Sequence, residues 1–294
     1  MSSEKFKGWE HVDGSKVSKE DTENAFIAVM QKAKQIENAY ISKKMKDKAS
    51  WLKKIAIAAA AVAVLVISPL AAYYIMSDPV DMTEYTASRG EIKEIILPDG
   101  SSVVLNSEST LTCPDRFGRK RAVTLSGEAL FTVTACKRHP FIVNTKDICI
   151  TAYGTVFNVS DYSEEPTACA TLCSGIVSVH KTGEDNHEVT LTPDQSLTLE
   201  KATGSMTTRK TDAKEVSSWK DGNLRMRSLP LEQALRIVER KFDVDIHLTT
   251  DKYNDAVLTA KFINDEGLVE LMDALCKLVP GMQYTIEDKN IYIR

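Results

Sequence analysis

The hydrophobic positions divide the chain into four segments with different periods. In residues 26–41 apolar side chains recur three and four positions apart, which is the period of an amphipathic helix. Residues 55–76 contain no charged side chain. From about residue 85 to 200, short runs of Val, Ile, Thr, Leu and Phe alternate with turn residues, which favours strands, and after residue 219 both periods occur. The pattern predicts a multi-domain α+β protein with one wholly apolar helix.

The uncharged run from Ile55 to Met76 is long enough to cross a bilayer. At about 1.5 Å per residue it matches the ~30 Å hydrocarbon core. A buried helix of a globular protein is rarely apolar on every face for this long. A cleaved secretory signal would not follow a 54-residue arm. Trp51 and the pair Tyr73 and Tyr74 lie where interfacial aromatic side chains are found. We therefore predict a transmembrane helix over residues 55–76.

Charge on the two sides of this segment predicts its orientation. Lysines dominate the N-terminal side, with only Asp47 among them: Lys43, Lys44, Lys46, Lys48, Lys53 and Lys54. On the other side Asp78, Asp81 and Glu84 come before the first arginine. Because an excess of lysine marks the cytoplasmic side, residues 1–54 are predicted to be cytoplasmic and the residues after the span extracytoplasmic.

The N-terminal arm carries an apolar stripe that it cannot bury alone. Ser18, followed by Asp21, has the pattern of a helix N-cap. The residues of the stripe, which share one helical face, are Phe26, Val29, Met30, Ala33, Ile36, Tyr40 and Ile41. An arm of 54 residues is near the lower size limit for independent folding. The stripe therefore predicts one of two partners: another protein, or the membrane surface, on which a basic amphipathic helix can lie.

Two folds are predicted beyond the span. Residues 77–202 predict an all-β domain, a roll, solenoid or sandwich, in which EIIL-PDGS-SVVL is a hairpin. Residues 203–218 are polar and predict an exposed linker. Residues 219–294 predict the order β-α-β-β-α-β-β, with helices near residues 230–242 and 267–279, which is a small α+β domain.

Composition and charge do not require a nucleic-acid partner. The chain has 294 residues, 43% of them hydrophobic, and a formal net charge of −4. Its basic excess lies beside the span, where topology and attraction to anionic lipids explain it, so direct nucleic-acid binding is not needed. All six cysteines follow the span, where disulfides are allowed. Cys169 and Cys173 are expected on one strand, too far apart to bond each other, and the thiols are expected to be small apolar fillers.

The sequence offers little catalytic chemistry. None of the five histidines has the spacing of a metal site, and neither a nucleophile elbow nor a phosphate-binding glycine loop is present. Asp99, Glu108 and Glu128 fall on predicted turns, where exposed carboxylates are common, rather than forming a catalytic pair. We predict no cofactor, no metal and no enzyme acting on an external substrate.

Ordered motifs beyond the span match a known family. They are LPDGSSVVLN, GEALFTV, HPFIVNT, GTVFNV and WKDGNL, and the likeness covers most of residues 85–294. Here the chain resembles the FecR-like family of inner-membrane anti-sigma factors. It departs from the family at Cys113 and Cys136, where a thiol is unusual, and at Phe26, where many relatives have Trp.

The resemblance implies a function and partners. The arm, residues 1–54, would hold an extracytoplasmic-function sigma factor in the cytoplasm, through Phe26, Val29, Met30, Ala33, Ile36 and Tyr40. The periplasmic part would receive a signal from the signalling domain of a TonB-dependent outer-membrane transporter. The C-terminal domain resembles the small secretin/TonB-type domain, whose edge strands can accept a further strand. The alternatives are a structural envelope protein anchored by the span, and a membrane-tethered hydrolase.

Two further sites follow from the family. Its spans are typically cut by an intramembrane protease, and Ser68 with Pro69 would weaken the helix there, although a harmless kink is an equal alternative. Some members cleave themselves at a Gly-Thr pair that aligns with Gly154 and Thr155. The plainer interpretation of AYGTVFNVSDY is a half-buried strand from Tyr153, with Gly154 at a bulge or a tight approach.

Overall fold

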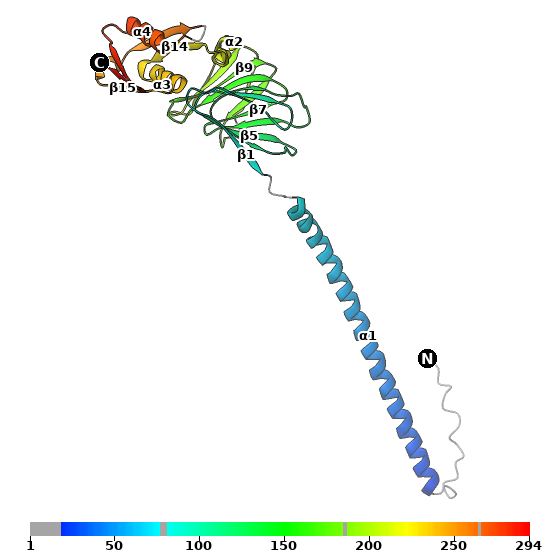
Figure 1. Ribbon diagram of the computed structural model, residues 1–294. Helices are drawn as coiled ribbons and strands as arrows, with labels where there is room; N and C mark the ends of the chain where they lie inside the picture. The colour runs from blue at the N-terminus through cyan, green and yellow to red at the C-terminus, as the bar shows by residue number, and fades with distance from the viewer. Residues whose placement is uncertain (1–18, 77–80, 185–186, 264–265) are drawn as a thin grey trace. The chain divides into compact units, whose positions relative to one another are not determined.

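A computed structural model of the chain describes residues 19–76, 81–184, 187–263 and 266–294. It divides into two compact units, Met1–Pro79 and Val80–Arg294. The protein has mixed α+β structure: one long N-terminal helix, then a large curled sheet and a smaller α+β region (Figure 1). The predicted N-cap, Ser18, lies outside the described residues.

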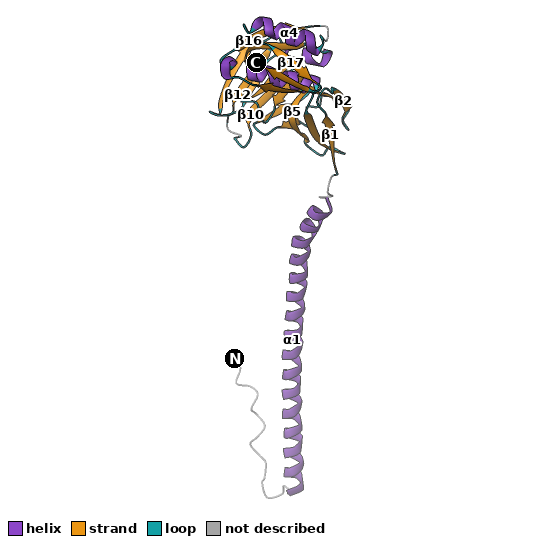
Figure 2. Cartoon of the chain, turned by 60° about the vertical axis from the view of Figure 1, so that its left-hand side comes forward, coloured by secondary structure: helices purple, strands orange, loops and turns teal. Residues whose placement is uncertain are grey.

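In the first unit the described residues form one helix, α1 (Lys19–Met76), of 58 residues. The amphipathic segment and the uncharged segment therefore form one continuous helix, drawn in purple in Figure 2. Among the described residues α1 alone is long and apolar enough to cross a membrane. Pro69 lies inside it, and the helix continues to Met76 although proline removes one backbone hydrogen bond.

The second unit begins with a curled sheet of thirteen strands, which we call the β region. These are β1 (Met82–Ala87), β2 (Lys93–Ile96), β3 (Ser102–Leu105), β4 (Ser109–Pro114), β5 (Arg121–Thr132), β6 (Phe141–Asn144), β7 (Ile148–Ala152), β8 (Val156–Asp161), β9 (Thr167–Ser174), β10 (Val177–Lys181), β11 (Val189–Leu191), β12 (Gln195–Glu200) and β13 (Ser205–Lys210). The predicted hairpin of EIIL-PDGS-SVVL is confirmed as β2 and β3.

Strand β5 joins the two faces of the curl. Its first half pairs with β4 and β6, and its second half pairs with β3 and β8. Gly127 lies at the change of face with a φ of 102°, where a side-chain carbon would overlap Ser109. Only glycine adopts this backbone readily and leaves room for the neighbouring strand.

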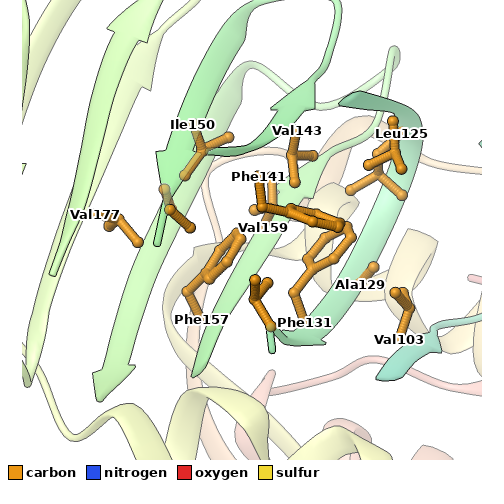
Figure 3. Packing of buried hydrophobic residues seen from close by; sticks show 14 of the residues in the cluster. Val103, Leu125, Ala129, Phe131, Phe141, Val143, Ile150, Phe157, Val159 and Val177 are labelled. Atoms are coloured by element: carbon orange, nitrogen blue, oxygen red, sulfur yellow. The ribbon is translucent and has the colours of Figure 1, made fainter. Parts of the chain in front are cut away.

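The core of the β region lies inside the curl. Phe131, Phe141 and Phe157 are fully buried, and the rings of Phe131 and Phe157 stack with centroids 5.2 Å apart. Figure 3 shows these rings directed toward one another, with Val143 and Ile150 around them. These side chains come from alternating positions on four strands, which is why the sequence shows a period of two.

The predicted linker over residues 203–218 is wrong. Residues 205–210 form β13, which pairs along its whole length with β12. The short helix α2 (Ala213–Val216) follows, capped by the side chain of Asp212, and then a 3-10 turn over Ser217–Asp221. An edge strand whose side chains are mostly exposed has a polar composition, and Met206 alone packs against the core. Composition therefore could not distinguish this strand from a linker.

The C-terminal region has the predicted order of elements. They are β14 (Leu224–Pro230), α3 (Leu231–Phe242), β15 (Asp245–Leu248), β16 (Val257–Phe262), α4 (Leu268–Leu278), β17 (Tyr284–Glu287) and β18 (Asn290–Ile293). β14 pairs with β16, while β18 lies between a parallel β15 and an antiparallel β17. The two helices and these strands enclose a second hydrophobic core.

Candidate functional site

The apolar stripe of α1 is exposed in the described part of the chain. Phe26, Val29, Ile36 and Tyr40 are each 65% exposed and Met30 is 56% exposed. Ala33 is exposed as well. Because an α-helix turns by about 100° per residue, these side chains fall on one face. The structure thus brings the six predicted sigma-factor-binding residues together on one face, and no other element of residues 19–76 covers them.

The C-terminal end of the stripe is basic and aromatic. Tyr40 and Trp51 border a shallow hollow on the helix surface together with three lysines, Lys43, Lys44 and Lys48. The ammonium of Lys44 lies 5.9 Å from the centre of the Tyr40 ring. Such a surface can accept acidic side chains of a protein or the headgroups of lipids.

A cavity of about 770 Å³ lies in the second unit, where the C-terminal region packs on the β region. The Glu128 carboxylate on its wall accepts hydrogen bonds from the Nδ2 groups of Asn106 and Asn158, both 2.8 Å long. Trp219 donates its indole N–H to the Asn158 oxygen at 3.1 Å. Burial raises the pKa of Glu128, while the two asparagine bonds lower it by a smaller amount.

The prediction of an exposed turn position is therefore wrong for two of the three carboxylates. Glu128 lies on β5 and faces this cavity. Asp99 is a turn residue, but its side chain is only 13% exposed and pairs with Arg121 at 2.7 Å. Glu108 fits the prediction, with an exposed side chain beside Arg89. The period of two could not reveal the burial of Glu128, since its amide partners come from β8 and from the loop between β3 and β4, both distant in sequence.

Arginines of α3 join the C-terminal region to the β region. Arg240 is only 7% exposed, lies 3.9 Å over the ring of Tyr162 and forms an ion pair with Glu165. Arg236 donates to the Glu164 backbone carbonyl at 2.7 Å. We call these contacts of Arg236 and Arg240 the α3 latch. Sequence analysis missed it, because a basic residue in the last turn of a helix is usually a solvent-exposed one.

The Gly154–Thr155 pair lies just before β8, not inside a strand as predicted. The strand begins at Val156, and Tyr153 points outward with 49% of its surface exposed. Gly154 has a φ of 138°, and a side-chain carbon there would overlap Ala135, so the tight approach is present. Thr155 is 4% exposed, and its hydroxyl has no hydrogen-bond partner among the described residues.

Four of the six cysteines, Cys113, Cys149, Cys169 and Cys173, lie on strands of the β region, whereas Cys136 lies in a loop and Cys276 on α4. Cys169 and Cys173 both lie on β9, as predicted. Cys113 is 1% exposed, and burial raises its pKa to about 11. A thiol with such a pKa stays protonated at neutral pH and is a poor nucleophile. Within the described ranges no cluster of three His, Cys, Asp or Glu side chains could hold a metal ion.

Residues 83–178 match the family described as FecR protein, and residues 223–293 match the family described as FecR, C-terminal. Two crystal structures, at 2.50 Å and 1.65 Å resolution, are similar to this chain, and both are titled "putative anti-sigma factor" from Parabacteroides distasonis. Each has a TM-score of 0.68 and 26% identity, covering 72% of this chain and 98% of the other. The comparison with curated proteins found no match to the sequence.

These matches define an anti-sigma factor, a protein whose partner is a sigma factor. The chain belongs to the FecR-like family of anti-sigma factors. The one candidate membrane helix found in the described part of the chain, α1, fits the single-pass inner-membrane location of that family.

Proposed function

We propose that this anti-sigma factor holds an extracytoplasmic-function sigma factor in the cytoplasm through the stripe of α1. In this proposal α1 crosses the inner membrane once, residues 81–294 lie in the periplasm, and their C-terminal region receives the signalling domain of a TonB-dependent outer-membrane transporter. The chain is then bitopic, with a cytoplasmic arm, a periplasmic all-β FecR-like domain and a C-terminal secretin/TonB-type domain.

The exposed stripe is the observation that carries the proposal. Helices recognised in a groove place most of their binding energy in a few apolar anchors spaced three and four residues apart. Phe26, Val29, Ile36 and Tyr40 have this spacing and are each about two-thirds exposed. The lysines that follow favour a cytoplasmic location for the stripe.

Edge strands of the C-terminal region support the transporter part of the proposal. Among the described strands, β15 and β17 each pair with β18 alone, and β16 pairs with β14 alone. Val257 on β16 and Ile286 on β17 are exposed apolar side chains on these edge strands. An open edge with apolar side chains can accept a strand from a partner. The α3 latch would pass a change in this region to the β region.

Transcription from the target promoter tests the stripe. Phe26→Asp combined with Ile36→Asp should abolish repression, because two charges cannot enter an apolar groove. The matched control is Gln31→Asp with Gln35→Asp, on the opposite face of α1, which should repress normally. If the arm also activates its sigma factor, the stripe variant loses output instead. Normal regulation by the stripe variant at normal protein levels would contradict the proposal. A structural envelope protein would then be the better account.

Release by proteolysis within the span is a second part of the proposal. Pro69 removes one hydrogen bond inside α1, and Ser68 precedes it, so the helix is locally weaker there. Pro69→Leu should slow the appearance of the cytoplasmic fragment after induction. Identical fragment kinetics in immunoblots of the two chains would leave Pro69 as a kink only.

Self-cleavage between Gly154 and Thr155 is supported by the buried, unpartnered Thr155 hydroxyl. Its oxygen would attack the Gly154 carbonyl carbon, the C–N bond would break, and the Thr155 nitrogen would take the hydroxyl proton. Water would then open the resulting ester. Mass spectrometry of purified protein should find two associated pieces from wild type and from Thr155→Cys, but an intact chain from Thr155→Ala. Only intact wild-type chain would return both residues to a structural role.

A further inference from the structure

Two loops of the β region lie side by side at the end where β1 begins. Loop 115–120 connects β4 to β5, and loop 133–140 connects β5 to β6. The His139 ring nitrogen lies 2.9 Å from the carbonyl oxygen of Arg119, and Arg121 donates to the His139 carbonyl at 3.1 Å. The ring of Phe117 packs edge-on against Phe141 and fixes the first loop to the core. The loops therefore form one surface.

This surface is strongly basic. Arg119, Lys120, Lys137 and Arg138 are exposed and form no ion pair within the described ranges. The rest of the unit does not share this character, because residues 81–294 contain 25 Lys and Arg against 32 Asp and Glu. We call these four side chains the basic end. Nothing in the core packing needs four like charges on two adjacent loops, where they repel one another.

The basic end is close in the chain to the apolar helix. Met82, the first residue of β1, pairs with Pro114, and the Asp115 amide donates to the Asp81 carbonyl at 2.9 Å. Asp81 is five residues after Met76, the last residue of α1, so the chain between them spans at most about 18 Å. Loop 115–120 begins where this connection enters the β region.

Exposed apolar side chains occur at the same end. The Cys136 amide in loop 133–140 donates to the Tyr153 carbonyl at 3.0 Å, and Tyr153 is 49% exposed. Ala152, just before Tyr153, pairs with Val177, and the preceding Ile176 is 61% exposed. A tyrosine and an aliphatic side chain beside lysines and arginines are typical of surfaces that lie at a membrane interface.

We propose that the basic end binds the anionic phospholipid headgroups of the membrane that α1 crosses. The inference rests on α1 being a span, and it is independent of the sigma factor and of the transporter. The surface charge of an anionic bilayer attracts Lys and Arg side chains within a Debye length of about 10 Å, and the short connection between α1 and β1 allows the basic end to reach that layer. Binding there holds the β region against the bilayer and leaves the C-terminal region free for a partner.

Vesicle sedimentation of residues 81–294 tests the proposal. These residues are the second compact unit without Val80, and they contain two hydrophobic cores of their own, so the fragment is expected to fold without the helix. The fragment should sediment with phosphatidylcholine vesicles containing phosphatidylglycerol and should remain in solution with phosphatidylcholine alone or in high salt. Since each basic residue near an anionic bilayer contributes roughly fivefold to partitioning, reversal of all four should weaken binding by at least about a hundredfold.

The matched control reverses the same number of charges elsewhere. The test variant is Arg119→Glu, Lys120→Glu, Lys137→Glu and Arg138→Glu, and the control is Lys146→Glu, Lys252→Glu, Lys277→Glu and Arg294→Glu. Circular dichroism confirms that both remain folded, and Arg119→Gln with Arg138→Gln gives a milder second variant. Binding retained by the control and lost by the test variant supports the proposal. The proposal is overturned if the wild-type fragment does not bind the vesicles, if the control loses binding equally, or if the folded test variant still binds them. Binding of the basic end to an acidic protein instead of to vesicles would also overturn it.

Discussion

Helices α3 and α1 share a sequence pattern but differ in what covers it. Both carry apolar residues three and four positions apart. In α3 the four apolar residues Leu231, Ala234, Leu235 and Val238 are at most 5% exposed, because the helix packs on β14, β15 and β16. In α1 the corresponding face is about two-thirds exposed.

The difference distinguishes a stripe that forms part of a hydrophobic core, on α3, from a stripe that stays exposed, on α1. Burying a large apolar side chain contributes about 1.5–3 kcal/mol, so a chain that can cover its own stripe does so. The second unit has neighbouring strands to do this, whereas the first unit contains only α1 among the described residues. A stripe that stays exposed is expected to bind something outside the chain.

The largest effect is expected from a charge inside the covered face. Val238 is fully buried, so Val238→Asp should destabilise residues 81–294 by about 4 kcal/mol or more, because an unpaired carboxylate enters an apolar core. Chemical denaturation followed by circular dichroism measures this. Glu232→Gln, on the exposed side of α3, should change stability by less than about 0.5 kcal/mol. Equal stability of wild type and Val238→Asp would mean that the face is not covered in solution.

The α3 latch should have the next largest effect. Arg240→Ala leaves the Glu165 carboxylate without its partner and removes the cation from the Tyr162 ring. We expect a loss of about 2–3 kcal/mol, below the value for a fully buried pair because the Glu165 side chain is 20% exposed. Limited proteolysis should cut the variant faster near residues 217–221. Wild-type proteolysis and stability would show that α3 is held by its apolar face alone.

Glu128 makes the stability of the second unit depend on pH. Its pKa is raised above the ordinary 4.5, so the folded state holds the proton more tightly than the unfolded state does. Stability from this group is therefore greatest in acid and decreases as the pH rises through 4.5 and the higher folded pKa. Glu128→Gln removes the dependence. Denaturation at acid and neutral pH should show the variant gaining on wild type as the pH rises, and parallel curves would contradict the assignment.

How far sequence predicts structure differs between these regions. The order of elements in the C-terminal region followed from its periods, since Leu231, Leu235 and Val238 mark one helical face. The hairpin at Pro98–Gly100 followed from turn chemistry. β13 did not, because an edge strand with one packed side chain, Met206, has the composition of a loop.

The polar contacts were the least predictable part. The Glu128 carboxylate accepts hydrogen bonds from two amide side chains, one on β8 and one in the segment before β4. The guanidinium of Arg240 on α3 lies over the ring of Tyr162 in the β region. Each of these partners is far away in sequence, so no local sequence pattern predicts the contact. The α1 stripe was predictable for the opposite reason: its spacing of three and four residues is entirely local.

The smallest effect on stability is expected from the exposed stripe. Phe26→Asp with Ile36→Asp removes no contact of the described chain, so the helix content and unfolding of the full-length protein in detergent should change by less than about 0.5 kcal/mol. Circular dichroism and thermal unfolding measure this. A loss comparable to that of Val238→Asp would mean that the stripe is covered within the chain.

Binding of the sigma factor to the stripe tests the central claim most directly. Full-length protein in detergent is titrated with the purified extracytoplasmic-function sigma factor, and the dissociation constant is compared among wild type, Phe26→Asp with Ile36→Asp, and Gln31→Asp with Gln35→Asp. Interface anchors each contribute about 2 kcal/mol or more, so the stripe variant should bind at least about a hundredfold more weakly while the control binds as wild type does. Equal affinities for all three proteins would contradict the claim that this face of α1 is the sigma-factor site.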